Sequence, residues 1–246
     1  MPQKSLSPLS LIKKHKYRLL ALFIFVFVLS FLVLFFEVFR VKKVEVLTHI
    51  STSILGLESL YGQSTLLLSE KEIENYIIER NPVVRSVQMD IQYPSTLLFS
   101  LEIYKPVAIF DADAGYFILS EDGRVLEKMR KTTQDLPHVK FYQKISYLQT
   151  QPGDTVDFRE LEAGLSFYKS TLDLGLKIDT IDINGLNMIA LYVSKPDKQV
   201  SKVLFTTQKD AQQQAQELQT IIKKLRLEGK EFKSLDLRFK RPIIVF

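Results

Sequence analysis

Residues 19–36 read Leu-Leu-Ala-Leu-Phe-Ile-Phe-Val-Phe-Val-Leu-Ser-Phe-Leu-Val-Leu-Phe-Phe. Ser30 is the only polar residue in this run, which contains no charge and no proline. An α-helix rises about 1.5 Å per residue, so a helix of this length just crosses a hydrocarbon core of roughly 30 Å. We therefore expect a single transmembrane helix over residues 19–36.

The charges on either side of this run predict its orientation. After the run, Arg40, Lys42 and Lys43 are offset by Glu37 and Glu45, and a long domain follows, which translocates largely regardless of its charge. We expect residues 1–18 to be cytoplasmic and the chain after about residue 37 to be extracytoplasmic in the cell membrane. The leader contains only basic charges, namely Lys4, Lys13, Lys14, Lys16 and Arg18.

An apolar run near the N-terminus has two other interpretations. A cleaved secretory signal has a shorter apolar region and small residues at the cleavage site, whereas Phe35–Arg40 contains no Ala-x-Ala pattern. A buried core helix seldom has apolar residues all round and a basic leader in a chain of this size. An uncleaved anchor is favoured over both.

Composition limits the function of the remaining residues. About two hundred residues follow the apolar run, enough for one large domain or two small ones. The net charge of +5 owes much to the leader, and we find no basic patch interleaved with aromatic residues, so nucleic-acid binding is not expected. The absence of cysteine excludes disulfides, thiolate metal ligands and a cysteine nucleophile.

Residues 38–105 predict a small domain in the order strand, helix, helix, strand, strand. Ser69-Glu70-Lys71-Glu72 resembles a capping box that opens a helix, and Asn81-Pro82 ends it. Two helices can cover one face of a three-stranded sheet of this size. The expected elements are a strand near Val44–Val46, a weak helix at 51–61, the capped helix, and alternating strands at 86–93 and 97–103.

Residues 106–246 predict a second, larger domain after Lys105-Pro106. Glu121-Asp122-Gly123 favours a hairpin turn, as do Asn184-Gly185 and Lys195-Pro196-Asp197, and residues 129–157 are polar, with at most one short strand. The predicted fold class is α+β, with a mostly antiparallel sheet and flanking helices. The expected strands are 107–110, 116–119, 124–128, 178–183, 188–194, 200–206 and 234–246.

Two amphipathic helices are expected in this domain. The first opens at Asp157–Glu160 and ends at Gly175, and the second runs from about 208 to 227, with residues 212–214 on a polar face. The predicted buried stripes are Phe158, Leu161, Leu165, Tyr168 and Leu172 in the first, and Ala211, Ala215, Leu218, Ile222 and Leu225 in the second.

The last strand is expected to lie at the edge of its sheet. Pro242 cannot donate to a ladder, so the strand should have a free edge or a bulge there. Alternation places Leu235, Leu237 and Phe239 inward, and Asp236, Arg238 and Lys240 outward.

The sequence contains no recognisable catalytic constellation. The three histidines, His15, His49 and His138, are far apart, and no serine lies in a Gly-x-Ser-x-Gly elbow. Residues 111–115 resemble the start of a calcium loop, but its twelfth position is Asp122 instead of glutamate, so a turn between strands is favoured. We expect no enzyme activity, cofactor, metal or small-molecule substrate, and interpret the chain as a binding module.

Seven short segments follow one another along residues 18–246, and their order matches the motifs of one protein family. They are Val41–Val46, Asn81–Val87, Tyr93–Leu97, Glu102–Ala108, Asp122–Val125, Leu136-Pro137 and Leu235–Phe239. Together they resemble the FtsQ/DivIB family of bacterial cell-division proteins, in which a short leader and one transmembrane helix precede a POTRA domain and a β-domain. Thr48-His49 departs from the family's usual Gly-Asn, and the sequence ends at Phe246, where many members continue.

The resemblance implies a POTRA domain at residues 38–105 and an FtsQ-type β-domain at 106–246. It also implies a scaffold at the division septum that holds FtsB-like and FtsL-like partners and helps control septal peptidoglycan synthesis. A strand of the FtsB-like partner would be added to the last strand of the β-domain. The implied partner-binding residues are Ser234, Leu235, Leu237, Arg238, Phe239, Lys240 and Arg241.

Two alternatives remain at this point. One is a membrane-anchored extracytoplasmic cell-wall hydrolase that uses acids such as Asp111, Asp113 and Asp122. The other is a POTRA-bearing protein of outer-membrane export. The N-terminal anchor argues against this second alternative.

Overall fold

The computed structural model describes residues 8–48, 53–185, 187–194 and 200–246. The chain divides into two compact units, Met1–Arg80 with Ser86–Glu102, and Asn81–Arg85 with Ile103–Phe246. Lys4, His49 and the turn expected at Lys195-Pro196-Asp197 lie outside the described residues.

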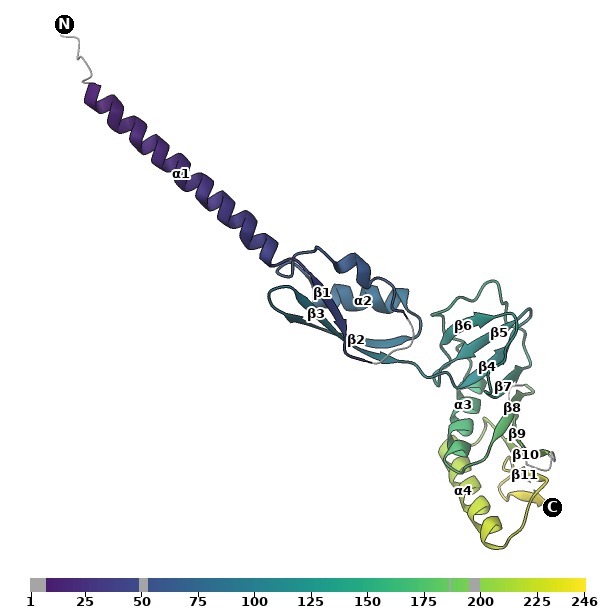
Figure 1. Ribbon diagram of the computed structural model, residues 1–246. Helices are drawn as coiled ribbons and strands as arrows, with labels where there is room; N and C mark the ends of the chain where they lie inside the picture. Colours follow the sequence, from purple (N-terminus) through teal and green to yellow (C-terminus); the bar gives the residue numbers. More distant parts are fainter. Residues whose placement is uncertain (1–7, 49–52, 186, 195–199) are drawn as a thin grey trace. The chain divides into compact units, whose positions relative to one another are not determined.

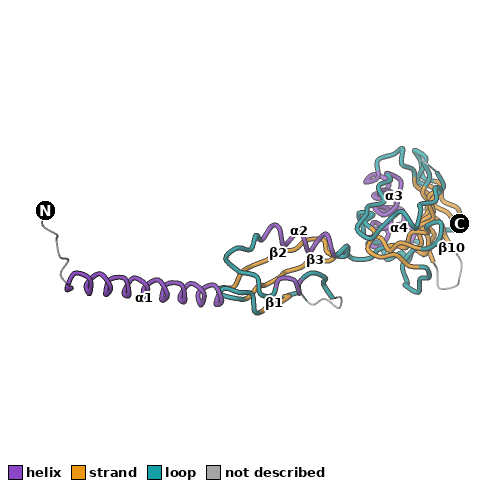
Figure 2. The backbone as a smooth tube through the Cα atoms, turned by 90° about the horizontal axis from the view of Figure 1, so that it is seen from above, coloured by secondary structure: helices purple, strands orange, loops and turns teal. Residues whose placement is uncertain are grey.

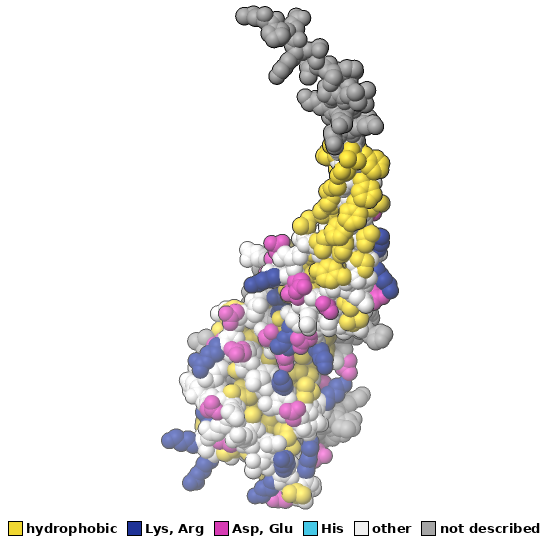
Figure 3. Space-filling view, turned by 90° about the vertical axis from the view of Figure 1, so that its left-hand side faces the viewer, with side chains coloured by type: hydrophobic (Ala, Val, Ile, Leu, Met, Phe, Trp, Pro, Cys, Tyr) yellow, Lys and Arg dark blue, Asp and Glu magenta, His cyan; other side chains and the backbone are white. Residues whose placement is uncertain are grey.

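The apolar run is a helix. α1 (Pro8–Val38) begins well before the expected span and includes the segment Leu20–Val38, which is long and apolar enough to cross a membrane. None of that segment is buried, so the interpretation as a core helix is wrong. Its side chains form a column of hydrophobic groups, and charged side chains appear where the column ends (Figure 3).

The small sheet belongs to the first unit. β1 (Lys43–Val46) pairs in parallel with β3 (Thr96–Ile103), which lies between β1 and β2 (Val84–Gln92). Only residues 93–95 connect β2 to β3, a length that allows only an antiparallel hairpin. The expected alternation holds in both long strands, because Val87, Met89, Leu97, Phe99 and Leu101 are buried.

α2 (Glu70–Arg80) supplies the helical part of this unit and is drawn beside the sheet in Figure 1. It begins directly after Ser69 and ends before Asn81-Pro82, as expected, and buries Ile73 and Ile77. The helix expected at 51–61 is wrong in extent. Within the described residues 53–61 the helical part is η1, a single 3₁₀ turn at Leu57–Leu60 that follows Gly56, whose φ of 97° is incompatible with a continuing right-handed helix.

The second unit contains a nine-stranded mixed sheet in the order β12-β11-β10-β9-β8-β7-β4-β5-β6. Five neighbouring pairs are antiparallel and three are parallel, and β7 pairs in parallel with both β4 and β8. The strands are β4 (Ala108–Asp111), β5 (Tyr116–Leu119), β6 (Val125–Met129), β7 (His138–Phe141), β8 (Ile178–Ile183), β9 (Ile189–Ser194), β10 (Val200–Phe205), β11 (Ser234–Asp236) and β12 (Ile243–Val245).

α3 (Arg159–Leu172) and α4 (Ala211–Leu227) lie together against this sheet (Figures 1 and 2). The stripe expected on α3 is partly wrong, because Leu172 is 50% exposed whereas Phe167 is buried and stacks on Phe205 at 4.1 Å between ring centroids. Gly164 gives the physical reason. A Cβ there would lie 3.3 Å from Ile181, so the helix approaches β8 at this glycine and buries the neighbouring face.

The helix ends also differ from the expectation. α3 has Phe158 at its N-cap with no side-chain hydrogen bond, so Asp157 does not cap it. α4 begins after Asp210, whose carboxylate accepts a 2.7 Å hydrogen bond from the amide of Gln213. Leu218, Ile222 and Leu225 are buried as expected.

The polar face expected at residues 212–214 is wrong for its last member. Gln214 is fully buried, and its amide group bonds the main chain of Thr206, accepting from the N–H at 3.0 Å and donating to the C=O at 2.8 Å. These bonds satisfy main-chain groups where β10 ends, which explains a buried amide on this helix.

Candidate partner-binding site at the sheet edge

The final segment of the chain is two short strands instead of one. β11 is hydrogen-bonded to β10 on one side and to β12 on the other, so Ser234 and Leu235 have no free main-chain edge. The expected edge at β11 is therefore wrong. Among the strands that the structure describes, β12 is the edge of the sheet at this end and pairs antiparallel with β11 alone.

A local turn explains the break. The carboxylate of Asp236 accepts a 3.0 Å bond from the amide of Arg238, two residues on, and this Asx-type bond competes with the ladder. The chain then reverses through residues 238–241. Pro242, which the sequence marked as incompatible with an inner strand, lies between this turn and β12.

β12 presents apolar side chains on both of its faces. Ile244 packs against the hydrophobic core. Ile243 and Val245 point the other way and are 50% and 49% exposed, and the following Phe246 is 56% exposed. A short edge strand with exposed branched side chains suits the addition of another strand.

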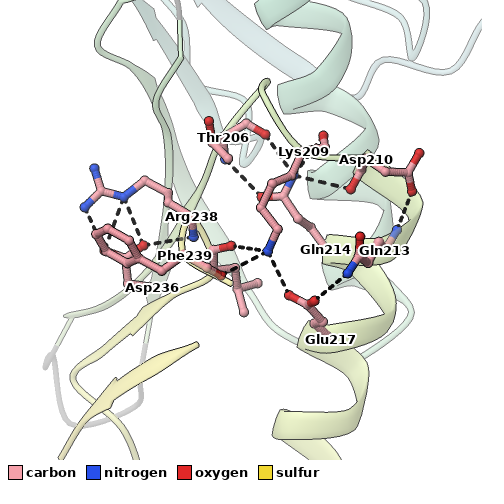
Figure 4. Close-up of polar contacts among 10 residues, drawn as sticks. Thr206, Lys209, Asp210, Gln213, Gln214, Glu217, Asp236, Arg238 and Phe239 are labelled. Atoms are coloured by element: carbon pink, nitrogen blue, oxygen red, sulfur yellow. Dashed lines mark hydrogen bonds and ion pairs between the residues drawn. The ribbon is translucent and has the colours of Figure 1, made fainter. Parts of the chain in front are cut away.

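Lys209 and Glu217 hold the connection between β11 and β12 in place (Figure 4). The ammonium of Lys209, which precedes α4, donates to the main-chain oxygens of Leu237 at 2.9 Å and Phe239 at 3.1 Å. It also lies 3.2 Å from the Glu217 carboxylate on α4. Both side chains are largely buried, so this contact fixes the turn beside the edge.

Asp236 and Arg238 form the main ion pair of the site. Burial raises the pKa of Asp236, but hydrogen bonds and the charge of Arg238 outweigh it, so the pKa lies below its ordinary value. The hydrogen bond to Asp236 in turn raises the pKa of Arg238. The guanidinium donates to both carboxylate oxygens, at 2.7–3.2 Å. It also lies 3.2 Å from the sulfur of Met188, the residue before β9.

The seven residues expected to bind a partner therefore fall into two groups. Leu235 and Leu237 are fully buried core residues, and Ser234 is half-buried in an inner strand. Phe239, 51% exposed, follows Arg238, whose guanidinium lies 5.6 Å from its ring centroid. The turn brings together Arg238, Phe239, Lys240 and Arg241 beside β12.

Several residues of the site were missed from the sequence. Ile243, Val245 and Phe246 form the edge, and Lys209 and Glu217 support it. The run Ile-Ile-Val-Phe after Pro242 is a signal for a separate strand, because proline there interrupts the preceding ladder. Nothing local to Lys209 points to a turn nearly thirty residues further along the chain.

The acids considered for a hydrolase each have a structural partner. Asp111 lies 2.8 Å from Nδ1 of His138, and Asp113 accepts a 2.7 Å bond from the amide of Tyr147. Asp122 accepts a bond from the hydroxyl of Ser120 in the hairpin turn. Across the residues with a described position, no group of three histidine or acidic side chains could hold a metal ion.

Comparison of the chain with protein-family models and with curated proteins gave no match.

Proposed function

We propose that this chain is a non-enzymatic scaffold of the FtsQ/DivIB type, anchored in the cell membrane by α1. In this proposal residues 38–105 form the POTRA domain and residues 106–246 form the β-domain. The scaffold binds FtsB-like and FtsL-like partners at the division septum and so helps control septal peptidoglycan synthesis. The order of the elements in the first unit, β1-η1-α2-β2-β3, supports the POTRA assignment.

The observation that carries the proposal is the edge strand β12. Its outer main-chain groups offer a ladder to a partner strand, and Ile243 and Val245 supply contacts on one face of the extended sheet. The docking position thus moves from residues 234–241, where the resemblance implied it, to the strand that follows, β12. Phe239 and Phe246 flank this edge as exposed aromatic groups, a class of residue enriched at protein interfaces.

The turn beside the edge adds a preference in charge. Lys240 and Arg241 are exposed, whereas Arg238 is already paired with Asp236. A partner strand with acidic residues next to its paired segment would meet a favourable field, which chiefly raises the association rate and selects the register.

Cross-linking in membranes tests this docking mode, because the chain contains no cysteine. Val245→Cys and Phe239→Cys, each combined with single cysteines along the FtsB-like partner, should form disulfides at alternate partner positions. Leu227→Cys is the matched control, since Leu227 is 89% exposed on α4. Co-purification of the partner without cross-links from either edge position, or with equal cross-linking from Leu227→Cys, would refute docking at β12.

A charge at the edge gives an independent measurement. Phe239→Glu should weaken partner binding by roughly tenfold or more, as expected for an exposed aromatic anchor, while leaving the circular dichroism spectrum unchanged. Leu237 is unsuitable for this experiment, because a charge at a fully buried position would disrupt the fold itself. The hydrolase alternative would gain support only if the purified protein degraded peptidoglycan and Asp→Asn changes abolished the activity.

A further inference from the structure

Within the first unit, the end of α1 is joined to the three-stranded part without a linker. The amide of Thr65 donates a 2.7 Å bond to the oxygen of Phe39, the first residue after the helix. The buried Thr65 hydroxyl lies 2.9 Å from the same oxygen and 2.8 Å from the oxygen of Pro94. Arg40 then forms a β-bridge with Ser64.

The next residues continue the same attachment. The amide of Val41 donates to Gln63 at 2.8 Å, and that of Lys42 donates to Ser95 at 2.9 Å. Main-chain hydrogen bonds therefore fix two segments distant in sequence, the loop 62–67 and the turn 93–95, to residues 39–42, which directly follow α1.

The length of α1 places this attachment at a definite depth. The apolar segment Leu20–Val38 has 19 residues, and a helix of that length spans about 28 Å, close to the thickness of a hydrocarbon core. Val38 then ends near the boundary with the headgroups, a layer roughly 5–8 Å thick on each side. Groups hydrogen-bonded to Phe39 must lie inside or just above that layer.

The residues at this position suit the membrane interface. Leu67 is 80% exposed and Leu66 42% exposed, and both directly follow Thr65. Tyr93, 60% exposed, precedes Pro94, and its ring lies 6.4 Å from that of Phe39 in an edge-on arrangement. Tyrosine is enriched at the headgroup level, where its ring is apolar and its hydroxyl is hydrated.

We propose that these four residues, Phe39, Leu66, Leu67 and Tyr93, form a membrane-proximal patch that inserts into the headgroup layer of the bilayer crossed by α1. The occupant is a lipid surface, because the patch is continuous with the apolar helix through the bonds of Phe39. The inference rests on the proposed anchor and goes beyond it: the three-stranded unit is held on the membrane surface and not on a flexible stalk.

Single-tryptophan variants of the full chain test the proposal, because the protein contains no tryptophan. Tyr93→Trp and Leu67→Trp are reconstituted in vesicles of phosphatidylcholine and phosphatidylglycerol, with brominated lipid as the quencher from the membrane side and acrylamide as the quencher from water. We expect blue-shifted emission and loss of fluorescence with brominated lipid at both positions. Leu47→Trp is the matched control, since Leu47 is 61% exposed beyond the far end of β1.

Leu29→Trp, inside the apolar segment, separates failure of the patch from failure of the anchor. If this variant is quenched by brominated lipid while positions 67 and 93 behave like position 47, the anchor stands and the patch is refuted. If Leu29→Trp is itself quenched only by acrylamide, the anchor is refuted and the patch with it. Binding to a different protein is excluded as the cause of any shift, because the vesicles contain only this chain, and brominated lipid separates contact with lipid from contact with a second copy.

A charge within the patch provides the complementary result. Leu67→Glu should shift the emission of Tyr93→Trp to the red and reduce its quenching by brominated lipid, because a charge is expensive to place near hydrocarbon. Leu148→Glu, at a 73% exposed position of the second unit, should leave both readings unchanged. An unchanged spectrum in the Leu67→Glu variant would overturn the proposal.

Discussion

The ammonium of Lys209 donates a 2.9 Å hydrogen bond to the main-chain oxygen of Leu237. The same group reaches the oxygen of Phe239, so one side chain is bonded to the residue before the bend that follows β11 and to a residue within it. A lysine from the loop before α4 thus determines where β12 can pair. The edge proposed for partner binding depends on a contact that is distant in sequence.

Replacing Lys209 should loosen this bend. Lys209→Met removes the donor to two main-chain oxygens and leaves Glu217 without its cation, which we expect to cost about 1–3 kcal/mol in unfolding free energy. Hydrogen exchange over residues 237–246 should become faster, as measured by mass spectrometry. Lys223→Met, at an exposed position on α4, is the control, and equal exchange in the two variants would contradict the assigned role.

Replacing Gln214 should destabilise the end of β10. Gln214→Leu preserves the size of the side chain but leaves the amide and the carbonyl of Thr206 unpaired in a buried position, which should cost about 2–4 kcal/mol. Gln212→Leu, on the exposed face of the same helix, should change stability by less than about 0.5 kcal/mol. Chemical denaturation measures both, and a similar loss in the two variants would show that burial is not the cause.

Replacing Gly115, in the turn between β4 and β5, should disturb its packing against β6 and against the loop that follows β7. A Cβ there would lie 2.6 Å from the ring of Tyr147 and 2.7 Å from the main-chain oxygen of Met129, which cannot move aside easily. Gly115→Ala should therefore destabilise the protein by about 1–3 kcal/mol. Ala114→Ser, at the exposed neighbouring position, serves as the reference in the same denaturation experiment, and equal stability of both variants would be the contrary result.

The Asp236–Arg238 pair should make stability depend on pH in the acid range. Because the pKa of Asp236 is lower in the folded protein than its ordinary value of 3.8, the pair contributes fully above that value and its contribution is lost as pH falls through the folded pKa. The carbon NMR signal of the carboxyl group should titrate below 3.8. In Arg238→Gln the titration should move upward; an unmoved titration would mean that Arg238 is not the cause.

The local sequence pattern was sufficient to predict those helices and strands that have one buried face. The strands around Val87 and Phe99 were predicted because alternate side chains enter a core, and α2 because Asn81-Pro82 ends it. The pairing of β7 with β4 and β8 could not be predicted, since parallel neighbours are joined only through long connections.

The site was harder to predict, because its decisive contacts are side chain to main chain. The alternation of Leu235, Leu237 and Phe239 is typical of an uninterrupted strand, and Leu235 and Leu237 are indeed buried. The bond from the amide of Arg238 to Asp236 ends that strand, and hydropathy carries no information about such a bond. In the same way, Gln214 belongs to a polar run and is buried only because Thr206 needs its amide.

β7 has only four residues, yet it joins two antiparallel meanders, β4-β5-β6 and β8-β9-β10, into one sheet. Each meander can form from neighbouring residues in sequence, whereas β7 has to find partners in both and pay the loop-closure entropy of doing so. We infer that the two halves assemble quickly and that their union is the slow step in folding of the second unit.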